Sequence, residues 1–107
     1  MDASLDLNEL LIKNKAASFY IRVSGESMNG AGIMSGDILL VDRSLEPINN
    51  RIVVAIIDNK MVLKRLRIAK GQTFLVSENP KYKPIKILGD MDFYIWGVVS
   101  AVVRKLS

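Results

Sequence analysis

Residues 51–77 read RIVVAIIDNKMVLKRLRIAKGQTFLVS, and this stretch decides the fold. Branched apolar residues recur in short runs, and turn-forming residues separate the runs. Such a pattern is typical of β-strands. Asp58-Asn59 is suited to a tight hairpin turn, and Lys70-Gly71 marks a second break. The stretch therefore predicts three successive strands, at residues 51–58, 60–68 and 72–77.

Further strand patterns lie on both sides of this stretch, and a short helix precedes them all. The outer strands are predicted at residues 18–23, 37–42 and 93–104. Asp6 and Glu9 have the spacing of a capping box, with Glu9 reaching back, which predicts a helix that begins after Asp6, runs to about Lys13 and packs against the rest of the domain. The chain is thus expected to be a mainly β, compact domain, with an arm and helix in residues 1–17 and the core in residues 18–107.

The last predicted strand, residues 93–104, is apolar on both faces. A strand at a solvated sheet surface alternates with polar residues, whereas a strand covered on both faces does not need to. The second cover is either another subunit or the same chain, and the sequence leaves both alternatives open.

The amino-acid composition excludes several kinds of catalytic and metal-binding site. The 107 residues contain no cysteine and no histidine, which excludes disulfides, Ser–His–Asp and Cys–His catalysis, and zinc sites with histidine or thiolate ligands. We expect no metal and no cofactor. The net charge of +4 either assists contact with DNA or acidic proteins or only keeps the chain in solution. No apolar run is long enough to span a bilayer and the acidic N-terminus does not resemble a signal peptide, so we expect a cytoplasmic protein without a membrane partner.

Two residues stand out as candidates for chemistry. Ser27 lies in Ser-Gly-Glu-Ser-Met, directly after a predicted strand, a context that is common in ordinary turns as well. Lys64 shares a strand face with Val62 and Leu66, where a lysine is unexpected. Burial there would lower the pKa of the amine and let it accept a proton from a serine hydroxyl. The alternative is an edge lysine that extends its amine to water.

Together these two places resemble the LexA/UmuD family of self-cleaving peptidases. The resemblance rests on the motif at residues 24–28, on Gly-Asp-Ile-Leu-Leu-Val at residues 36–41 and on Val-Leu-Lys-Arg-Leu at residues 62–66. Ser27 and Lys64 are 37 positions apart (64 minus 27), as the family's motifs require. The resemblance covers about residues 5–104 and implies the β-fold that LexA shares with signal peptidases.

The family resemblance also implies roles for individual residues. Ser27 is expected to be the nucleophile and Lys64 the general base of a Ser–Lys dyad, and the pair should lie within hydrogen-bonding distance. The backbone N–H groups of Ser27 and Met28 are the expected oxyanion donors. Met28 and Ile33 would line or support the cleft, or would simply pack in the core.

Within the family, residues 5–12 resemble the UmuD branch in particular. A Cys-Gly or Ala-Gly cleavage bond is missing upstream of Ser27, so we expect this chain to correspond to the processed form. The resemblance then implies a homodimer that acts in the SOS response and in SOS mutagenesis. Its expected partners are a Y-family polymerase subunit, with which it forms a DNA polymerase V-like translesion enzyme, and the RecA filament. DNA would be contacted only indirectly.

Two other functions remain as alternatives. The chain could be the dimerisation core of a LexA/CI-type repressor, which a linked DNA-binding domain in the full gene would reveal. It could also be a small basic β-domain that binds nucleic acid directly, for which exposed aromatic rings would have to stack on bases. The seven aromatic residues are scattered along the chain, which argues against this second alternative.

Overall fold

The computed structural model describes residues 6–106 and consists mainly of antiparallel β-sheet. One short helix, α1 (Leu7–Leu11), precedes the strands, and two 3₁₀ turns lie at Lys15–Ala17 and Asn29–Ala31. The strands are β1 (Ser18–Arg22), β2 (Ile38–Asp42), β3 (Ile52–Ile57), β4 (Lys60–Ala69), β5 (Gln72–Val76), β6 (Ile85–Lys86) and β7 (Phe93–Val103). The mainly β fold and all six predicted strands are confirmed; the two-residue β6 was not predicted.

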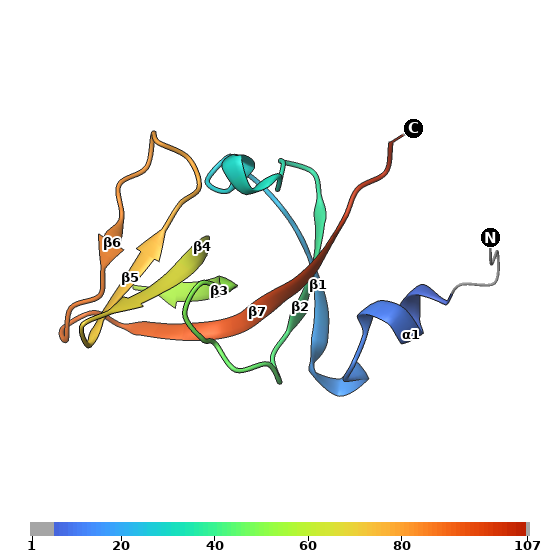
Figure 1. Ribbon diagram of the computed structural model, residues 1–107, viewed down its shortest axis with the longest axis horizontal. Coiled ribbons are helices and arrows are strands. Elements are labelled where there is room, and N and C mark those ends of the chain that lie inside the picture. Colours follow the sequence, from blue (N-terminus) through green and yellow to red (C-terminus); the bar gives the residue numbers. More distant parts are fainter. Residues whose placement is uncertain (1–5, 107) are drawn as a thin grey trace.

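The strands form a single sheet in the order β1-β2-β7-β3-β4-β5-β6 (Figure 1). Every neighbouring pair is antiparallel. The β3–β4 turn places Asp58 and Asn59 at φ angles of 47° and 67°, and the β4–β5 turn places Lys70 and Gly71 at 51° and 73°. Left-handed residues at both central positions give a turn whose twist matches that of the strands it joins. The two turn signals in the sequence therefore produce two tight hairpins.

The long strand β7 joins the two halves of the sheet. Its first half pairs with β3 and its second half pairs with β2, and the register shifts in each pairing. Register shifts of this kind increase the local twist of a sheet, and Figure 1 shows β7 running the length of the curved sheet. Val98, at the middle of β7, is buried, whereas Tyr94 and Val102 are exposed. The strand is thus internal to the sheet of one chain, and a covering subunit stays a prediction.

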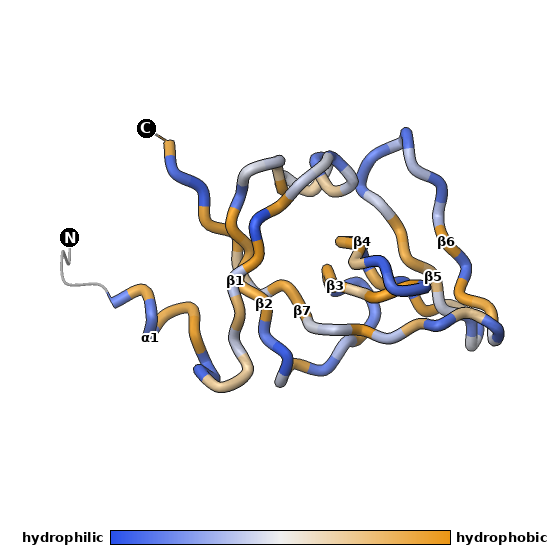
Figure 2. Tube along the Cα trace, turned by 180° about the vertical axis from the view of Figure 1, so that it is seen from behind, coloured by the Kyte–Doolittle hydropathy of each residue, from blue (hydrophilic) through white to orange (hydrophobic). Residues whose placement is uncertain are grey.

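Two apolar clusters fill the curved sheet. The first lies between β1, β2 and the loop that follows β1, and contains Val23, Met28, Ile33, Leu39, Val41 and Val54. The second lies between β3, β4, β5 and β7, and contains Val53, Ala55, Leu66, Leu75 and Val98. Figure 2 shows hydrophobic colour along much of the central strands and hydrophilic colour in most of the connecting loops. Met28 and Ile33 therefore belong to the core, and Met28 in addition lines the pocket beside Ser27, so that both predicted roles apply to Met28.

The structure of helix α1 differs from the prediction in its end and in its packing. Asp6 does cap it, since the Asn8 N–H donates to Asp6 Oδ1 over 2.9 Å. The helix ends at Leu11 rather than near Lys13, and Leu7 and Leu10 are 58% and 52% exposed. The predicted packing against the domain is wrong, because α1 lies beside the sheet and buries none of its own residues (Figure 1). Within residues 6–106, no helix is long and apolar enough to cross a membrane.

Candidate active site

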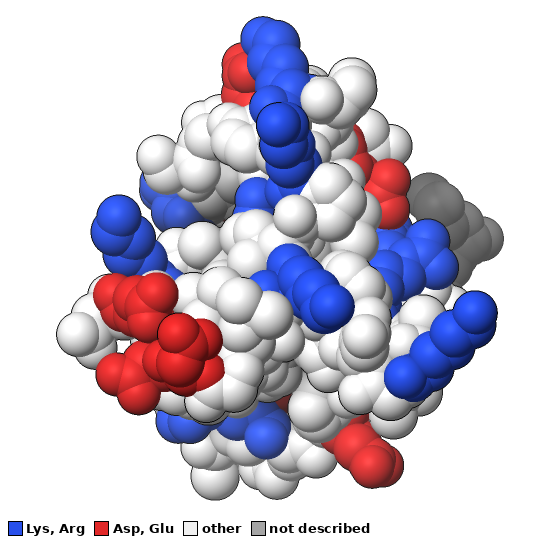
Figure 3. Space-filling model, turned by 90° about the vertical axis from the view of Figure 1, so that its left-hand side faces the viewer, with Lys and Arg blue, Asp and Glu red and all other residues white. Residues whose placement is uncertain are grey.

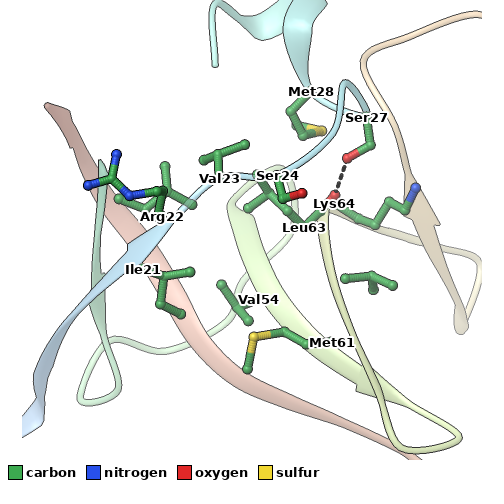
Figure 4. A pocket seen from close by; sticks show the side chains of 12 residues that line it. Ile21, Arg22, Val23, Ser24, Ser27, Met28, Val54, Met61, Leu63 and Lys64 are labelled. Carbon is green, nitrogen blue, oxygen red and sulfur yellow. Dashed lines mark hydrogen bonds between the residues drawn. The ribbon is translucent and has the colours of Figure 1, made fainter. Parts of the chain in front are cut away.

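A largely apolar pocket of about 370 Å³ opens between β1, β4 and the loop of residues 24–36, called here the serine loop (Figure 4). Only Arg22, Ser24, Ser27 and Lys64 contribute polar side chains to its wall. The remaining lining residues are Ile21, Val23, Met28, Leu39, Val54, Met61, Val62 and Leu63. The two residues that the sequence singled out for chemistry thus lie in the wall of the same pocket.

Ser27 is partly buried at the start of the serine loop. Its hydroxyl donates to the backbone oxygen of Leu63, over a distance of 2.9 Å. Leu63 is the residue directly before Lys64, so the hydroxyl lies against the strand that carries the lysine. Figure 4 shows this bond and shows that the Ser27 side chain points at the backbone of β4.

Lys64 is buried in β4, with only 7% of its surface exposed. Its amine donates to the Ser77 hydroxyl over 2.5 Å and lies 4.8 Å from the centre of the Tyr82 ring. Burial lowers the pKa of the Lys64 amine from its ordinary value of 10.5, because the charged form loses its hydration. The prediction that Lys64 is buried and that its pKa is depressed is confirmed, and the alternative of an amine extended to water is excluded.

The predicted hydrogen bond between Ser27 and Lys64 is absent from this structure. Within residues 6–106, the two side chains donate to different acceptors, Ser27 to Leu63 and Lys64 to Ser77. In Figure 4 the Lys64 side chain turns away from the Ser27 hydroxyl. The physical reason is that each donor has a well-placed acceptor of its own. Ser27 and Lys64 therefore line the same pocket without a hydrogen bond to each other.

Two backbone donors are available beside the Ser27 hydroxyl. In the described part of the chain, the N–H groups of Ser27 and Met28 donate to no other protein group, whereas the N–H groups of Asn29, Gly30 and Ala31 all do. Free N–H groups next to a nucleophile are what an oxyanion requires. The arrangement thus leaves open the oxyanion role that the family resemblance implies for Ser27 and Met28.

The serine loop is held from one side by the β5–β6 loop, residues 77–84. The Gly30 N–H donates to the Glu78 oxygen over 2.8 Å, and the Glu78 N–H lies 3.4 Å from the Met28 sulfur. The Asn79 side-chain amide donates to the Glu26 oxygen over 2.8 Å. A Cβ atom at Gly30 would lie 2.4 Å from the Glu78 oxygen, so only glycine fits this approach. These contacts fix the position of Ser27 relative to β4 and β5.

The far end of the serine loop is held by an ion pair between the buried Asp37 carboxylate and the exposed Arg104 side chain. Asp37 accepts two hydrogen bonds from Arg104, of 2.6 and 2.7 Å, and one from the Met34 N–H. Arg104 also donates to the Gly32 oxygen over 2.7 Å. The hydrogen bond from Arg104 is the main cause that lowers the pKa of Asp37 from 3.8 to about 2. The carboxylate therefore stays charged near neutral pH and keeps its hydrogen bonds to Arg104 and to the Met34 N–H.

The sequence interpretation missed Ser77, although the register of a hairpin could have located it. The turn at Lys70-Gly71 pairs Ala69 with Gln72, and each step outward pairs the next residues. The last pair is Arg65 with Val76, so Ser77 continues the ladder opposite Lys64. Residues opposite each other on neighbouring strands share a face. Tyr82 and Asn79 had no comparable signal, because they lie in an irregular loop.

No metal centre accompanies these residues. In the region from residue 6 to residue 106, no three or more acidic, histidine or cysteine side chains gather where they could hold a metal ion. The site offers instead a serine hydroxyl, a buried amine and backbone donors beside an apolar pocket. This set of groups is suited to covalent catalysis with a lysine base.

The sequence is similar to known proteins over most of its length. The sequence model of the family described as Peptidase S24-like matches residues 1–100. Protein ImpA of Salmonella typhimurium is 39% identical over 105 residues, which cover 97% of this chain and 70% of ImpA. Protein SamA of the same species, strain LT2, is 36% identical over 104 residues, covering 97% and 71%. The LexA repressor of Stenotrophomonas maltophilia is 40% identical over 89 residues, covering 83% of this chain and 42% of the repressor.

Proposed function

The chain belongs to the peptidase S24-like family, as a UmuD-like member of the LexA/UmuD group, and on this premise we propose that it is a Ser–Lys peptidase core that serves SOS mutagenesis. The observation that carries the proposal is the shared pocket. Ser27 touches the backbone of the residue before Lys64, and Lys64 is a buried lysine with a lowered pKa. A buried amine of this kind is the base that a chain without histidine can use.

In the proposed reaction, the Ser27 hydroxyl leaves the Leu63 oxygen and turns to the neutral amine of Lys64. The amine takes the hydroxyl proton while Oγ forms a bond with the carbonyl carbon of a peptide. The oxyanion that results accepts hydrogen bonds from the N–H groups of Ser27 and Met28. As the peptide C–N bond breaks, Lys64 returns the proton to the leaving nitrogen. A water molecule then hydrolyses the acyl-enzyme, again with Lys64 as the base.

The peptide substrate is proposed to bind as an extended segment along β4. The first half of β4 pairs with β3 on one edge, while its pairing with β5 begins only at Arg65. Its other edge is thus open beside the pocket, and an extended peptide can complete such an edge with backbone hydrogen bonds. The Leu63 oxygen, which now accepts from Ser27, lies on that edge. A bound peptide N–H would compete for this oxygen and release the Ser27 hydroxyl toward Lys64.

The proposed cellular role is that of a homodimeric accessory subunit of a DNA polymerase V-like translesion enzyme. Its partners would be a Y-family polymerase subunit and the RecA filament, with DNA contacted only through them. Similarity to ImpA and SamA across 97% of the chain supports this role over that of a repressor core, since the LexA relative matches over a smaller share of both chains. On the face drawn in Figure 3, the basic side chains are spread among uncharged ones, which disfavours direct binding to nucleic acid there.

Cleavage in trans tests the peptidase part of the proposal. The chain is mixed with full-length protein ImpA of Salmonella typhimurium, and ImpA alone is incubated in parallel as a blank. Shortened ImpA beyond that blank is followed on a gel between pH 7 and about 10, a range chosen to span lowered and ordinary lysine pKa values. A new band should form faster as pH rises, and Ser27→Ala and Lys64→Ala should not produce it. Ser100→Ala is the matched control, because Ser100 is not among the residues that line the pocket and donates to the Leu40 oxygen instead. Cleavage that survives in Lys64→Ala would refute the proposed base.

The cellular role needs a separate test. The chain is purified together with a Y-family polymerase subunit, and primer extension across a lesion is measured in the presence of RecA filaments. Extension that depends on the chain is the expected result. If the polymerase neither binds the chain nor changes its bypass of the lesion, the repressor-core alternative becomes the better one.

A further inference from the structure

The Ser77 hydroxyl is the one polar group of the described chain that accepts a hydrogen bond from the Lys64 amine. Ser77 lies just beyond β5 and continues the ladder opposite Lys64, where the distance from Oγ to Nζ is 2.5 Å. Both residues are buried, with 8% and 7% of their surfaces exposed. In such surroundings an amine without a partner is costly, so this contact decides where the amine lies.

The Tyr82 ring also lies beside the amine. Its centre lies 4.8 Å from Nζ, and the loop that carries it is fixed by hydrogen bonds from the Tyr82 and Lys81 N–H groups to Asn79. The nearest ion pair, Arg65 with Glu78 at 2.7 Å, comes from the residues that directly follow Lys64 and Ser77. Neighbouring residues of a strand point to opposite faces, so this pair lies on the other face of the hairpin.

We propose that Ser77 is a positioning residue for the Ser–Lys reaction, because it holds one N–H of Lys64 and so fixes the direction in which the amine presents its lone pair. This inference rests on the proposed function, which makes Lys64 the base. A neutral amine has two N–H groups and one lone pair. With one N–H on Ser77 and Tyr82 beside it, the lone pair is left for the Ser27 hydroxyl when that hydroxyl leaves Leu63. A free lysine side chain would lose rotamer entropy to reach one geometry, and a lysine already held by Ser77 does not.

Ser77→Ala should therefore change two measurable properties of the site. The rate of acylation at Ser27 should fall roughly tenfold, a part of the roughly 10²–10⁴-fold that a general base supplies. The midpoint of the pH–rate profile should also move to lower pH, because a hydroxyl acceptor stabilises the ammonium form more than the neutral amine. Within residues 6–106, the titratable or charged groups around Lys64 are Tyr82 on the β5–β6 loop and the ion pair between Arg65 of β4 and Glu78 of the β5–β6 loop, all unchanged by this substitution.

The experiment measures labelling of Ser27 by a fluorophosphonate probe, followed by intact mass between pH 6 and about 10.5, a range that brackets the ordinary pKa of lysine. Ser77→Thr retains a hydroxyl and should restore both rate and midpoint. Ser100→Ala is the matched control, since Ser100 donates to the Leu40 oxygen on the neighbouring strand β2 and should change neither. A rate and midpoint that are unchanged in Ser77→Ala would overturn the inference. A faster rate would overturn it too, because Ser77 would then hold the amine away from Ser27.

A second measurement separates this inference from the proposed function. If even the unaltered chain is not labelled, the proposed peptidase fails, yet the contact can still be tested. The ¹³C resonance of the Lys64 ε-carbon, assigned by its loss in Lys64→Met, is titrated in the unaltered chain and in Ser77→Ala. A lower pKa in Ser77→Ala is expected, and identical titrations would show that Ser77 does not hold the amine.

Discussion

Replacement of Gly30 by alanine is the most direct test of what fixes the serine loop. A Cβ atom built on Gly30 lies 2.4 Å from the Glu78 oxygen, and ordinary contact begins at 3.4 Å, so the two segments must separate by about 1 Å. The hydrogen bond from the Gly30 N–H to the same oxygen is 2.8 Å long and cannot survive that separation. The substitution thus removes the central contact between the serine loop and the β5–β6 loop.

The expected cost follows from these two effects. A lost backbone hydrogen bond costs about 1 kcal/mol, and a forced backbone shift costs a further 1–3 kcal/mol, roughly. Alanine recovers roughly 0.4–1 kcal/mol because it restricts the unfolded chain. We therefore expect Gly30→Ala to lower the free energy of unfolding by about 2 kcal/mol. Ser27, three positions before Gly30, should also move, and a shift of about 1 Å can reduce catalysis roughly 10²-fold.

Urea unfolding followed by the fluorescence of Trp96, the single tryptophan, measures the stability, and fluorophosphonate labelling measures the reactivity of Ser27. Gly89→Ala is the matched control, because a Cβ atom at Gly89 meets nothing within 4 Å. It should alter stability by less than about 0.5 kcal/mol. If Gly30→Ala is as stable and as reactive as Gly89→Ala, the contact with Glu78 does not fix the serine loop, and the argument is wrong.

Three further predictions concern charge and packing. The free energy of unfolding of the unaltered chain should rise as pH increases toward 10.5, because the unfolded state binds the Lys64 proton more tightly than the folded state does. Lys64→Met should be about 1 kcal/mol more stable at pH 7, and its free energy of unfolding, measured across the same pH range, should lack this rise. The stabilisation from Asp37 should be complete above pH 3.8 and disappear as pH falls through about 2, and Arg104→Gln should move this loss to higher pH in acid-unfolding curves. Met28→Ala, at a fully buried position, should cost roughly 2–5 kcal/mol in urea unfolding.

The sequence predicted the strands well because their signals are local. Alternation of side chains along β4 places Lys64 on its buried face, and the turn residues at Asp58-Asn59 and Lys70-Gly71 define both hairpins. The order of strands in the sheet was out of reach, since it depends on β7 pairing with both β2 and β3 across long stretches of chain. Helix α1 was placed wrongly against the domain because an amphipathic pattern shows which face is apolar but not whether a partner surface exists.

The residues of the candidate site could be predicted from the sequence, but the hydrogen bonds that they form could not. Ser27 and Lys64 were selected from motif and strand face, and they do line one pocket. Their separate acceptors, the Leu63 oxygen and the Ser77 hydroxyl, depend on positions that differ by fractions of an ångström, and no pattern in a sequence carries such detail. The ion pair of Asp37 and Arg104 was missed for another reason, as 67 positions separate the two residues.

The absence of a hydrogen bond between Ser27 and Lys64 has an energetic consequence for the proposed peptidase. To bring Ser27 to Lys64, the hydroxyl must give up its bond to the Leu63 oxygen, which costs about 1 kcal/mol. Each 1.4 kcal/mol reduces the engaged population about tenfold, so the chain alone should be a slow catalyst. A peptide that donates its own N–H to the Leu63 oxygen replaces the bond that the Ser27 hydroxyl gives up, and deprotonation of Lys64 removes the ammonium form, which cannot act as a base.

The rate of the proposed enzyme should therefore be limited by substrate pairing along β4 at high pH and by the protonation of Lys64 at low pH. The plateau rate should depend on which peptide is bound, whereas the midpoint of the pH–rate profile should not.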